Sequence, residues 1–521
     1  MTVYEGAVVT CDAAGSVQRF LVEDRGRIVY TGTVLPEAYS RAARVELGGG
    51  ALLPAFADTH THFMSHALFS GGLEVRDAKT IEESVSKVSD FAAARQDAMI
   101  LGFGASAHSI AERRLLSRAD LDRAAPDRPV FIVKYDGHAA VVNSKLLSQL
   151  PAKLSGLRGF DAHGGLMTQE AFFGVTNFVT GKVSLPATLA SMLATVDGLA
   201  AKGIGLLHSV SGVGFPLDMD VTLESLFARG LRNPFQYRLF FQTMDVKKVL
   251  KRKLPRIGGC FATALDGCFG TVDAALHEPY AGDAVNAGVL SYPDERVQAF
   301  AREANRAGLQ IEMHAIGDRA FDQAVEALTR ALADFPRTDH RHTIIHACLP
   351  TAKGLEACAR SGIAIAVQPA FLQWDQEPLS YLETILGERA YKLTPLESMR
   401  RLGIRMAGGS DAPCTVPDPI GSIWAACNHY VEGESLSVQE ALNLHTRNAA
   451  WMSFDEQERG SLEPGKTADM VVLDRNPLAV DRKKLKEVQV RQLLLAGRPY
   501  RAGQGRASLL LRGIAGRRRK I

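Results

Sequence analysis

Cysteine is scarce in this sequence, with seven residues among 521. The number is odd, the positions are scattered, and no two form a Cys-x-x-Cys pair. The seven positions are Cys11, Cys260, Cys268, Cys348, Cys358, Cys414 and Cys427. This pattern argues against a disulfide framework and is typical of reduced thiols, so we expect a cytoplasmic protein.

Long apolar runs and excess charge are also missing. No apolar stretch approaches the roughly 18–20 residues that span a bilayer, and the N-terminus lacks the basic and apolar regions of a secretory signal. The net charge of +3 predicts neither nucleic-acid nor membrane binding. Hydrophobic content of 46% and charged content of 22% are those of a globular protein. The one charge run, 517–520, is interpreted as a short solvated tail.

Both ends of the chain read as short strands separated by turns. Near the start these are 3–11, 17–23, 27–31 and 44–47, and near the end they are 468–474 and 488–496. The simplest arrangement is one composite β domain, sandwich-like, built from residues 1–53 and 455–505. Residues 506–521 are predicted to form a basic tail.

The middle section, 54–454, has a different sequence pattern. Short β-branched apolar runs recur there, most of them separated by segments with helical periodicity, such as 293–307, 320–333 and 352–361. The runs are 51–57, 129–135, 205–210, 259–265, 309–313, 343–347, 363–367 and 404–408. Eight alternating β and α units predict an α/β fold, a (β/α)8 TIM barrel. Its length implies an insertion, placed at about 66–128.

Candidate metal ligands follow several of these runs. His60 and His62 end the first, and because side chains alternate along a strand, both project the same way. His314, His346 and Asp411 each lie just after a further run. A barrel gathers the C-terminal ends of its strands at one mouth, where active sites lie. Imidazole and carboxylate together suit zinc or a similar divalent ion.

A metal in such a site predicts hydrolytic chemistry. It lowers the pKa of bound water to about 7, and Asp411 would take a proton from that water and pass it to the leaving group. Asp411 could instead only cap its Gly-Ser-Asp-Ala-Pro loop. In the Asp136-Gly-His138 stretch, His138 is a candidate substrate contact together with Asp136, or else orders its loop.

At this point the sequence resembles a known family. The similarity is to metal-dependent amidohydrolases of the amidohydrolase family 3 or YtcJ-like branch, which includes N-substituted formamide deformylases. It rests on six stretches in the family's order: 54–62, 136–144, 314–318, 345–347, 409–413 and 460–474. The resemblance implies a barrel with the composite sheet domain, hydrolysis of an amide or formamide C–N bond, and a homodimer. It also implies that His60, His62 and Asp411 hold one metal, and that His314 and His346 hold a second.

One position departs from the family pattern. Many relatives carry a metal-bridging carboxylated lysine four residues before an Asp-Gly pair, and here that position is Ala262. Cys260, two residues earlier and on the same strand face, is either a substitute thiolate ligand or, the favoured interpretation, a buried structural residue. The simpler hypothesis is one ion, by ligand type zinc, although two remain possible. The single-ion hypothesis places it on His60, His62, His314 and Asp411, with His346 as a further ligand or polarising the substrate carbonyl.

Three functions therefore compete. The favoured one is hydrolysis of a carbon–nitrogen bond outside peptides, in a small-molecule substrate. The second is a deaminase using one metal and the same ligands, which would release ammonia instead of an amine. The third is a catalytically idle barrel, supported by Ala262 and opposed by five intact candidate ligands.

Overall fold

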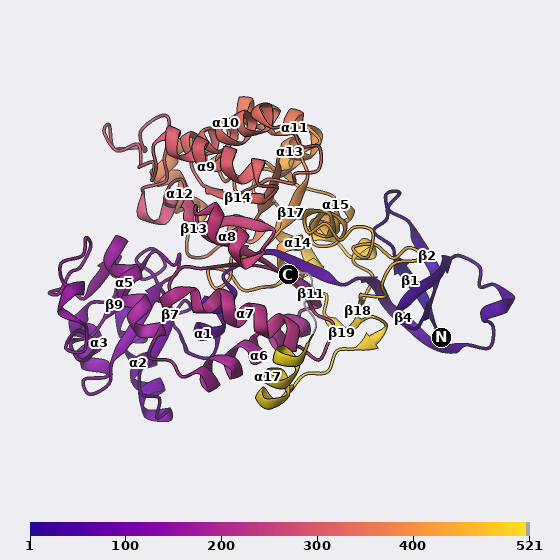
Figure 1. The fold of residues 1–521 in the computed structure, drawn as a ribbon, viewed down its shortest axis with the longest axis horizontal. Coiled ribbons are helices and arrows are strands. Elements are labelled where there is room, and N and C mark those ends of the chain that lie inside the picture. Colours follow the sequence, from indigo (N-terminus) through magenta and orange to yellow (C-terminus); the bar gives the residue numbers. More distant parts are fainter. Residues whose placement is uncertain (517–520) are drawn as a thin grey trace.

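The computed structural model describes residues 1–516 and 521, which form three β-sheets (Figure 1). The central sheet is parallel and has eight strands in the order β17-β16-β15-β14-β13-β12-β11-β5. Their bounds are β5 Phe56–Thr61, β11 Ile204–Ser211, β12 Gln236–Phe241, β13 Arg256–Ala264, β14 Gln310–Ala315, β15 Thr343–His346, β16 Ala364–Val367 and β17 Met406–Gly408. A parallel bridge between Thr61 and Ala412 brings the two ends of the sheet together. The (β/α)8 barrel expected from the sequence is confirmed.

One predicted barrel strand was wrong, and one barrel strand was missed. The run 129–135 forms β8 (Val130–Lys134), which belongs to a different sheet, and the barrel strand missed by the sequence analysis is β12. Gln236 and Arg238 interrupt the apolar pattern of β12, which is why it did not read as a core strand. Arg238 is nonetheless 1% exposed, because its guanidinium pairs with Asp455 inside the protein.

Helices follow the barrel strands and cover them. They are α1 Phe63–Ser70, α7 Met219–Gly230, α8 Val246–Arg252, α9 Asp294–Arg306, α10 Asp318–Asp334, α11 Ala352–Ser361, α12 Leu379–Leu386, α13 Leu396–Arg401 and α14 Pro419–Cys427. Helix α6, Leu185–Ala201, precedes β11, and α15, Val438–Leu444, and α16, Arg447–Met452, follow α14. Apart from α12 and α16, whose buried residues belong to two smaller clusters, these helices and the strands form one large buried cluster.

A second sheet lies between β5 and β11 in sequence. Its five strands, in the order β10-β9-β8-β7-β6, are β6 Leu73–Glu74, β7 Ile100–Ala105, β8, β9 Ala139–Val142 and β10 Leu166–Thr168. Helices α2 Ile81–Ala94, α3 Arg118–Ala124, α4 Ser144–Leu147 and α5 Gln169–Thr180 accompany it. The insertion therefore extends well past the predicted end at 128, because β8 to β10 and α5 belong to it.

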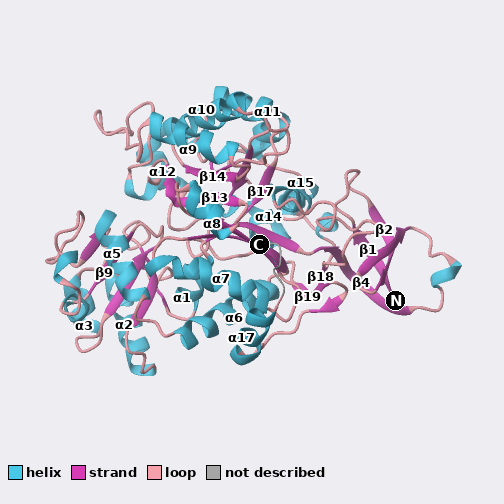
Figure 2. Ribbon diagram, in the orientation of Figure 1, coloured by secondary structure: helices cyan, strands magenta, loops and turns pink. Residues whose placement is uncertain are grey.

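The third sheet combines both ends of the chain. Its order is β20-β19-β18-β4-β1-β2-β3, and Figure 2 shows these strands extending away from the barrel and its helices. The strands are β1 Thr2–Val9, β2 Val17–Asp24, β3 Arg27–Gly32, β4 Ala43–Pro54, β18 Met470–Leu473, β19 Val490–Leu495 and β20 Arg498–Pro499. Only Ala55 separates β4 from β5, so the terminal sheet leads directly into the strand that carries His60.

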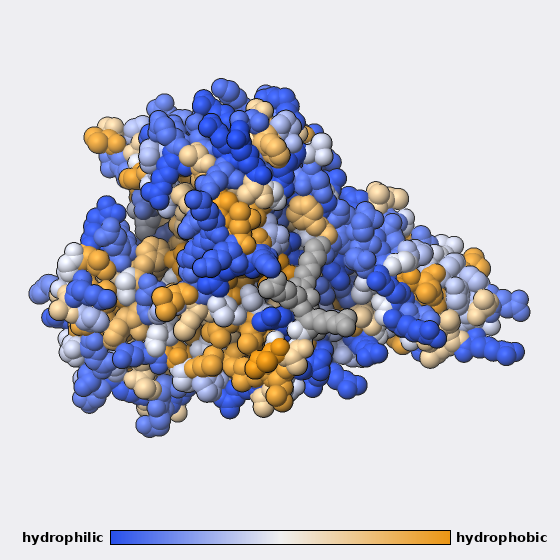
Figure 3. Space-filling view, in the orientation of Figure 1, coloured by the Kyte–Doolittle hydropathy of each residue, from blue (hydrophilic) through white to orange (hydrophobic). Residues whose placement is uncertain are grey.

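The segment 506–521 is not simply a tail. Residues Arg506–Ala515 form α17, which packs on α7 and buries Leu509 completely. The solvated run predicted at 517–520 lies outside the described residues. On the outer side of α17, Leu511 and Ile514 are 70% and 77% exposed, and Figure 3 shows apolar side chains gathered over this region. Helix α17 thus covers part of the barrel and presents an apolar face of its own.

A membrane-crossing helix was not expected from the sequence. Within the described residues, no single helix is both long and apolar enough to cross a bilayer, and α5 and α6 meet that test only as a pair bent by 104°.

A buried carboxyl group on α7 predicts an unusual dependence of stability on pH. Glu224 accepts hydrogen bonds from Ser211 Oγ of β11, at 2.5 Å, and from the Tyr237 hydroxyl of β12. Burial raises the pKa of Glu224 from 4.5 to about 8. The folded protein therefore keeps a proton that the unfolded chain loses, so this stabilisation is complete below pH 4.5 and disappears as the pH rises through 8.

Glu224→Gln is expected to remove that dependence. At pH 5 the variant should be close to wild type in stability, and its advantage should grow as the pH rises to 8 and then level off, reaching at least roughly 1–3 kcal/mol at pH 9. Thermal unfolding midpoints from pH 5 to 9 check this, with the exposed Glu326→Gln as control. A wild-type-to-variant difference that stays constant across this range would contradict the assignment.

Candidate metal centre

The two ends of the barrel sheet bring His60, His62 and Asp411 together. His60 lies on β5, His62 immediately follows this strand, and Asp411 lies in the loop after β17. The backbone N–H of Asp411 donates to the His60 carbonyl at 2.8 Å, and that of His62 donates to the Ala412 carbonyl at 2.9 Å. These two bonds fix the loop against the strand, so the three side chains face one point.

The carboxylate of Asp411 lies between the two imidazoles. Its Oδ1 is 3.1 Å from His60 Nε2 and 3.2 Å from His62 Nε2. Asp411 has φ of 56°, a left-handed conformation that is uncommon for residues other than glycine. Such backbone strain clusters at functional sites, where surrounding structure holds it in place.

His314 and His346 complete the group from the adjacent strands β14 and β15. Their ring centroids are 4.8 Å apart, and the His346 ring is 5.4 Å from that of His60. His346 Nδ1 is 2.7 Å from Gln368 Oε1, and Gln368 directly follows β16. This contact fixes the His346 ring so that Nε2 points towards the other candidate ligands.

The donor atoms are close enough to share a metal. Three triads each have donor atoms within 4.8 Å of one another: His60–His62–Cys260, Cys260–His314–His346 and His60–His346–Asp411. All of these residues are buried. The structure thus brings together all five predicted ligands and adds Cys260.

Unpartnered polar atoms indicate that this group fits a cation. Considering residues 1–516 and 521, both ring nitrogens of His60, Nδ1 of His314 and Oδ1 of Asp411 are buried and make no hydrogen bond. The close approach of Asp411 Oδ1 to His60 Nε2 and His62 Nε2 is an ion-pair contact without hydrogen-bond geometry, and the Asp266 carboxylate near His314 Nδ1 is 3.7 Å away. Burying such atoms unpaired costs about 1–3 kcal/mol each. A divalent ion with nitrogen and oxygen ligands would satisfy the atoms that face the centre, and the donor set is one that zinc accepts.

The protonation states also suit a metal. Burial lowers the pKa of His60 and His314, and it lowers that of His346 to about 4, so these imidazoles are neutral at pH 7. Burial alone would raise the pKa of Asp411, but the His60 and His62 rings outweigh it and hold the pKa well below its usual range. Neutral imidazole and ionised carboxylate are the forms that bind metal ions.

The strand that carries Cys260 is irregular. β13 pairs with β14 from Arg256 to Gly259, and the next pair joins Ala264 to His314, so residues 260–263 form a bulge. The Thr263 hydroxyl closes it by accepting from the Gly259 N–H at 2.9 Å, and Gln242 Oε1 accepts from the Phe261 N–H at 2.8 Å. The alternation used to place Cys260 and Ala262 on one face does not hold here.

The cavity beside the centre is lined from both the barrel and the insertion. Asp136 and His138, the predicted substrate-binding residues, belong to the loop after β8 and lie on its wall. Other lining residues are His62, Cys260, Phe261, Cys268, Phe269, His314, Ile316, His346, Cys348, Phe371, Trp374, Glu377, Asp411 and Cys414. The insertion therefore supplies one side of the candidate active site.

A second, more apolar compartment adjoins the first and shares His62, Phe261 and Cys414 with it. It lies between the insertion and the barrel. Its other lining residues are Ser65, Phe69, Phe103, Val133, Gly137, Phe172, Phe173, Thr176, Val213, Gly214 and Pro413. Phe261, from the bulge of β13, stands between the compartments, with its ring 4.8 Å from His62 and 5.5 Å from His138.

Several residues of this region were missed by the sequence analysis. Lys134 Nζ lies 2.5 Å from Asp136 Oδ2, and the Tyr135 hydroxyl donates to Glu377 Oε1 at 2.9 Å. Burial raises the pKa of Glu377 to about 7. Gln368 could have been predicted from the sequence, because it directly follows an apolar run as the histidines do. Glu377 lies after a 3-10 helix, in a loop with no comparable signal.

Arg76 connects the insertion to the loop that carries Asp411. Its Nη1 donates to the carbonyls of Pro413 and Cys414, both at 2.9 Å, and its guanidinium pairs with Glu74 of β6. The loop is thus held from the barrel by the His60 carbonyl and from the insertion by Arg76.

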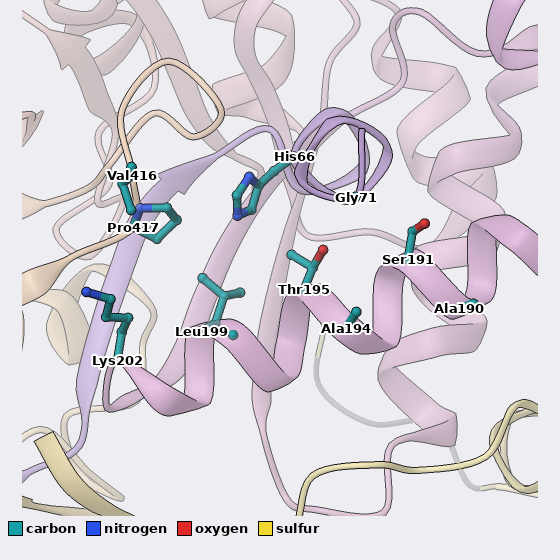
Figure 4. Close-up of a pocket in the computed structure, with 11 residues that line it drawn as sticks. His66, Gly71, Ala190, Ser191, Ala194, Thr195, Leu199, Lys202, Val416 and Pro417 are labelled. Atoms are coloured by element: carbon teal, nitrogen blue, oxygen red, sulfur yellow. The ribbon is translucent and has the colours of Figure 1, made fainter. Parts of the chain in front are cut away.

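A separate groove lies between α1, α6 and the loop at Val416 and Pro417 (Figure 4). His66 projects into it from α1, and burial lowers the pKa of this ring to about 4. The residues that line this groove include none of the candidate ligands, and its surface is mainly apolar. This groove is therefore separate from the candidate metal centre.

Comparisons with known proteins assign this chain to a family. The model of the amidohydrolase family matches residues 44–500. The putative amidohydrolase YtcJ of Bacillus subtilis is 29% identical over 91% of this chain and 94% of its own length. An N-substituted formamide deformylase of Arthrobacter pascens is 25% identical over 94% of this chain and 96% of its own. An uncharacterized metal-dependent hydrolase of Pyrococcus furiosus has a solved structure with a TM-score of 0.72 and 25% identity, covering 92% of this chain and 99% of that one.

A (β/α)8 barrel with histidine and carboxylate donors at its mouth is the arrangement expected of a metal-dependent amidohydrolase. The chain belongs to the amidohydrolase family, as its sequence indicated.

Proposed function

We propose that this protein hydrolyses a carbon–nitrogen bond of a non-peptide amide or N-substituted formamide. The observation that carries the proposal is the convergence of His60, His62, His314, His346 and Asp411 around one buried point, with unpartnered atoms facing it. Similarity to the Arthrobacter deformylase supports this bond type. Zinc is the ion we propose, because imidazole, carboxylate and thiol donors suit it.

In the proposed mechanism the chain's own groups move the proton. A divalent ion held by the histidines and Asp411 would lower the pKa of water and polarise the substrate carbonyl. Asp411, ionised at neutral pH, accepts the proton of the attacking water and then delivers it to the departing nitrogen. Gln368 keeps the His346 ring in place during both steps.

The two compartments suggest how the substrate lies. The carbonyl group occupies the compartment beside the metal centre, where His138 and Asp136 offer polar contacts. The apolar substituent occupies the compartment lined by phenylalanines, on the other side of Phe261. Most residues that line the compartment beside the metal centre are buried, and such surroundings strengthen electrostatic interactions at the reacting carbon.

The test is a substrate screen on the metal-loaded protein. We expect turnover with formamides or acylated amines, with release of an amine, or with cyclic amides, whose ring opens to an amino acid, and we expect loss of turnover after chelation. Restoration by zinc is the control. Release of ammonia instead would assign a deaminase, and a protein that binds no metal and turns over no substrate would be an idle barrel.

A further inference from the structure

Cys260 occupies a central place in the metal centre. It belongs to two of the three donor triads, with His60 and His62 in one and with His314 and His346 in the other. In both, all donor atoms lie within 4.8 Å of one another, and Cys260 Sγ is 3.9 Å from His346 Nε2. The sulfur therefore lies within reach of both histidine pairs.

The backbone of β13 is built to place it there. Gly258 and Gly259 have φ of 95° and 136°, and a Cβ on Gly258 would lie 2.0 Å from the Glu312 carbonyl oxygen. Only glycine fits this approach without displacing β14. The two glycines and the Thr263 hydroxyl therefore set up the bulge whose first residue is Cys260.

The surroundings of Cys260 differ from those of a packing cysteine. Cys358 on α11 is a member of the main apolar cluster, whereas Cys260 is outside that cluster and faces imidazoles. Both ring nitrogens of His60, which shares a donor triad with Cys260, are buried without a hydrogen bond, and this is a second, independent sign that a cation fits in this part of the described chain. A thiolate supplies the negative charge that neutral imidazoles lack.

We propose that Cys260 is a thiolate ligand shared by two divalent ions. One ion would also be held by His60, His62 and Asp411, and the other by His314 and His346. On binding, the thiol proton passes to solvent and sulfur–metal bonds form. This inference rests on the proposed function and replaces the expectation of a single ion. A soft sulfur ligand favours zinc or cobalt over magnesium and calcium.

Cobalt(II) substitution tests the proposal without relying on activity. The full-length wild-type protein loaded with cobalt should hold two ions per chain by elemental analysis and show sulfur-to-cobalt charge-transfer absorption in the near ultraviolet. Cys260→Ser should lose this absorption and retain only one tightly bound ion. Cys348→Ser and Cys414→Ser, which alter cysteines on the same cavity wall but outside the triads, should match wild type in both measurements.

A second variant covers the case in which Cys260→Ser fails to fold. Cys260→Asp keeps an anionic ligand and should restore the second ion without the absorption band. A wild-type protein with one ion, or with two ions and no band, overturns the inference, as does a band that persists in Cys260→Ser. Amide hydrolysis by such a protein would leave the proposed function standing, whereas absence of any bound metal would remove both.

Discussion

Asp411→Asn is expected to lower kcat for the identified substrate by about 10³-fold or more. The variant keeps the size of the side chain but removes the charge that contacts His60 and His62 and the group that carries the proton. General acid–base catalysis alone contributes roughly 10²–10⁴-fold. Steady-state kinetics together with metal content per chain measure the two contributions separately.

The matched control is Asp318→Asn. Asp318 begins α10, four residues after His314, and its Oδ1 accepts from the His277 backbone N–H at 2.8 Å. It is absent from the lining of the candidate active site, so its kcat should stay within a few-fold of wild type. An Asp411→Asn protein with full metal content and undiminished kcat would exclude Asp411 as the general base.

Asp455→Asn is expected to destabilise the folded protein by about 3–5 kcal/mol. Asp455 Oδ2 accepts from Arg238 Nε at 2.9 Å, and the two side chains are 4% and 1% exposed. Removing one member of a buried ion pair leaves the other charge in a medium that solvates it poorly. Denaturant or thermal unfolding, followed by circular dichroism, measures the change.

An exposed ion pair provides the comparison. Glu326 and Arg330 on α10 are 49% and 59% exposed, so Glu326→Gln should change stability by less than about 1 kcal/mol. If Asp455→Asn proves no more destabilising than Glu326→Gln, the buried pair does not hold β12 to the C-terminal segment as the structure indicates.

The candidate ligands could be located from the sequence because a barrel imposes a simple rule. Polar residues that follow short apolar runs meet at one mouth, and His60, His314, His346 and Asp411 all obey it. The same rule would have selected Gln368, whose role was recognised only from its contact with His346. The order of these residues along the chain was enough to bring them together, because barrel strands that follow one another in the sequence are adjacent in the sheet.

The remaining features depend on contacts between distant segments. β12 was missed because Arg238 interrupts its apolar pattern. The carboxylate that allows this arginine to be buried, Asp455, is 217 residues away in the sequence. The run 129–135 was assigned to the barrel because a buried strand of the insertion has the same apolar pattern as a barrel strand. The place of Cys260 depends on a bulge, and a bulge changes which residues face the site without changing composition.

Arg76 links the insertion, which forms one side of the candidate active site, to the loop that carries Asp411. The Arg76 guanidinium, which donates to the Pro413 and Cys414 carbonyls, belongs to the insertion. The insertion also supplies Asp136, His138 and three phenylalanines of the apolar compartment, Phe103, Phe172 and Phe173. If the insertion moved away from the barrel to admit a bulky substrate, it would displace the Asp411 loop or break both Arg76 hydrogen bonds. Proton transfer by Asp411 would then require the insertion to return to the position seen here, so substrate entry and proton transfer could not occur at the same time.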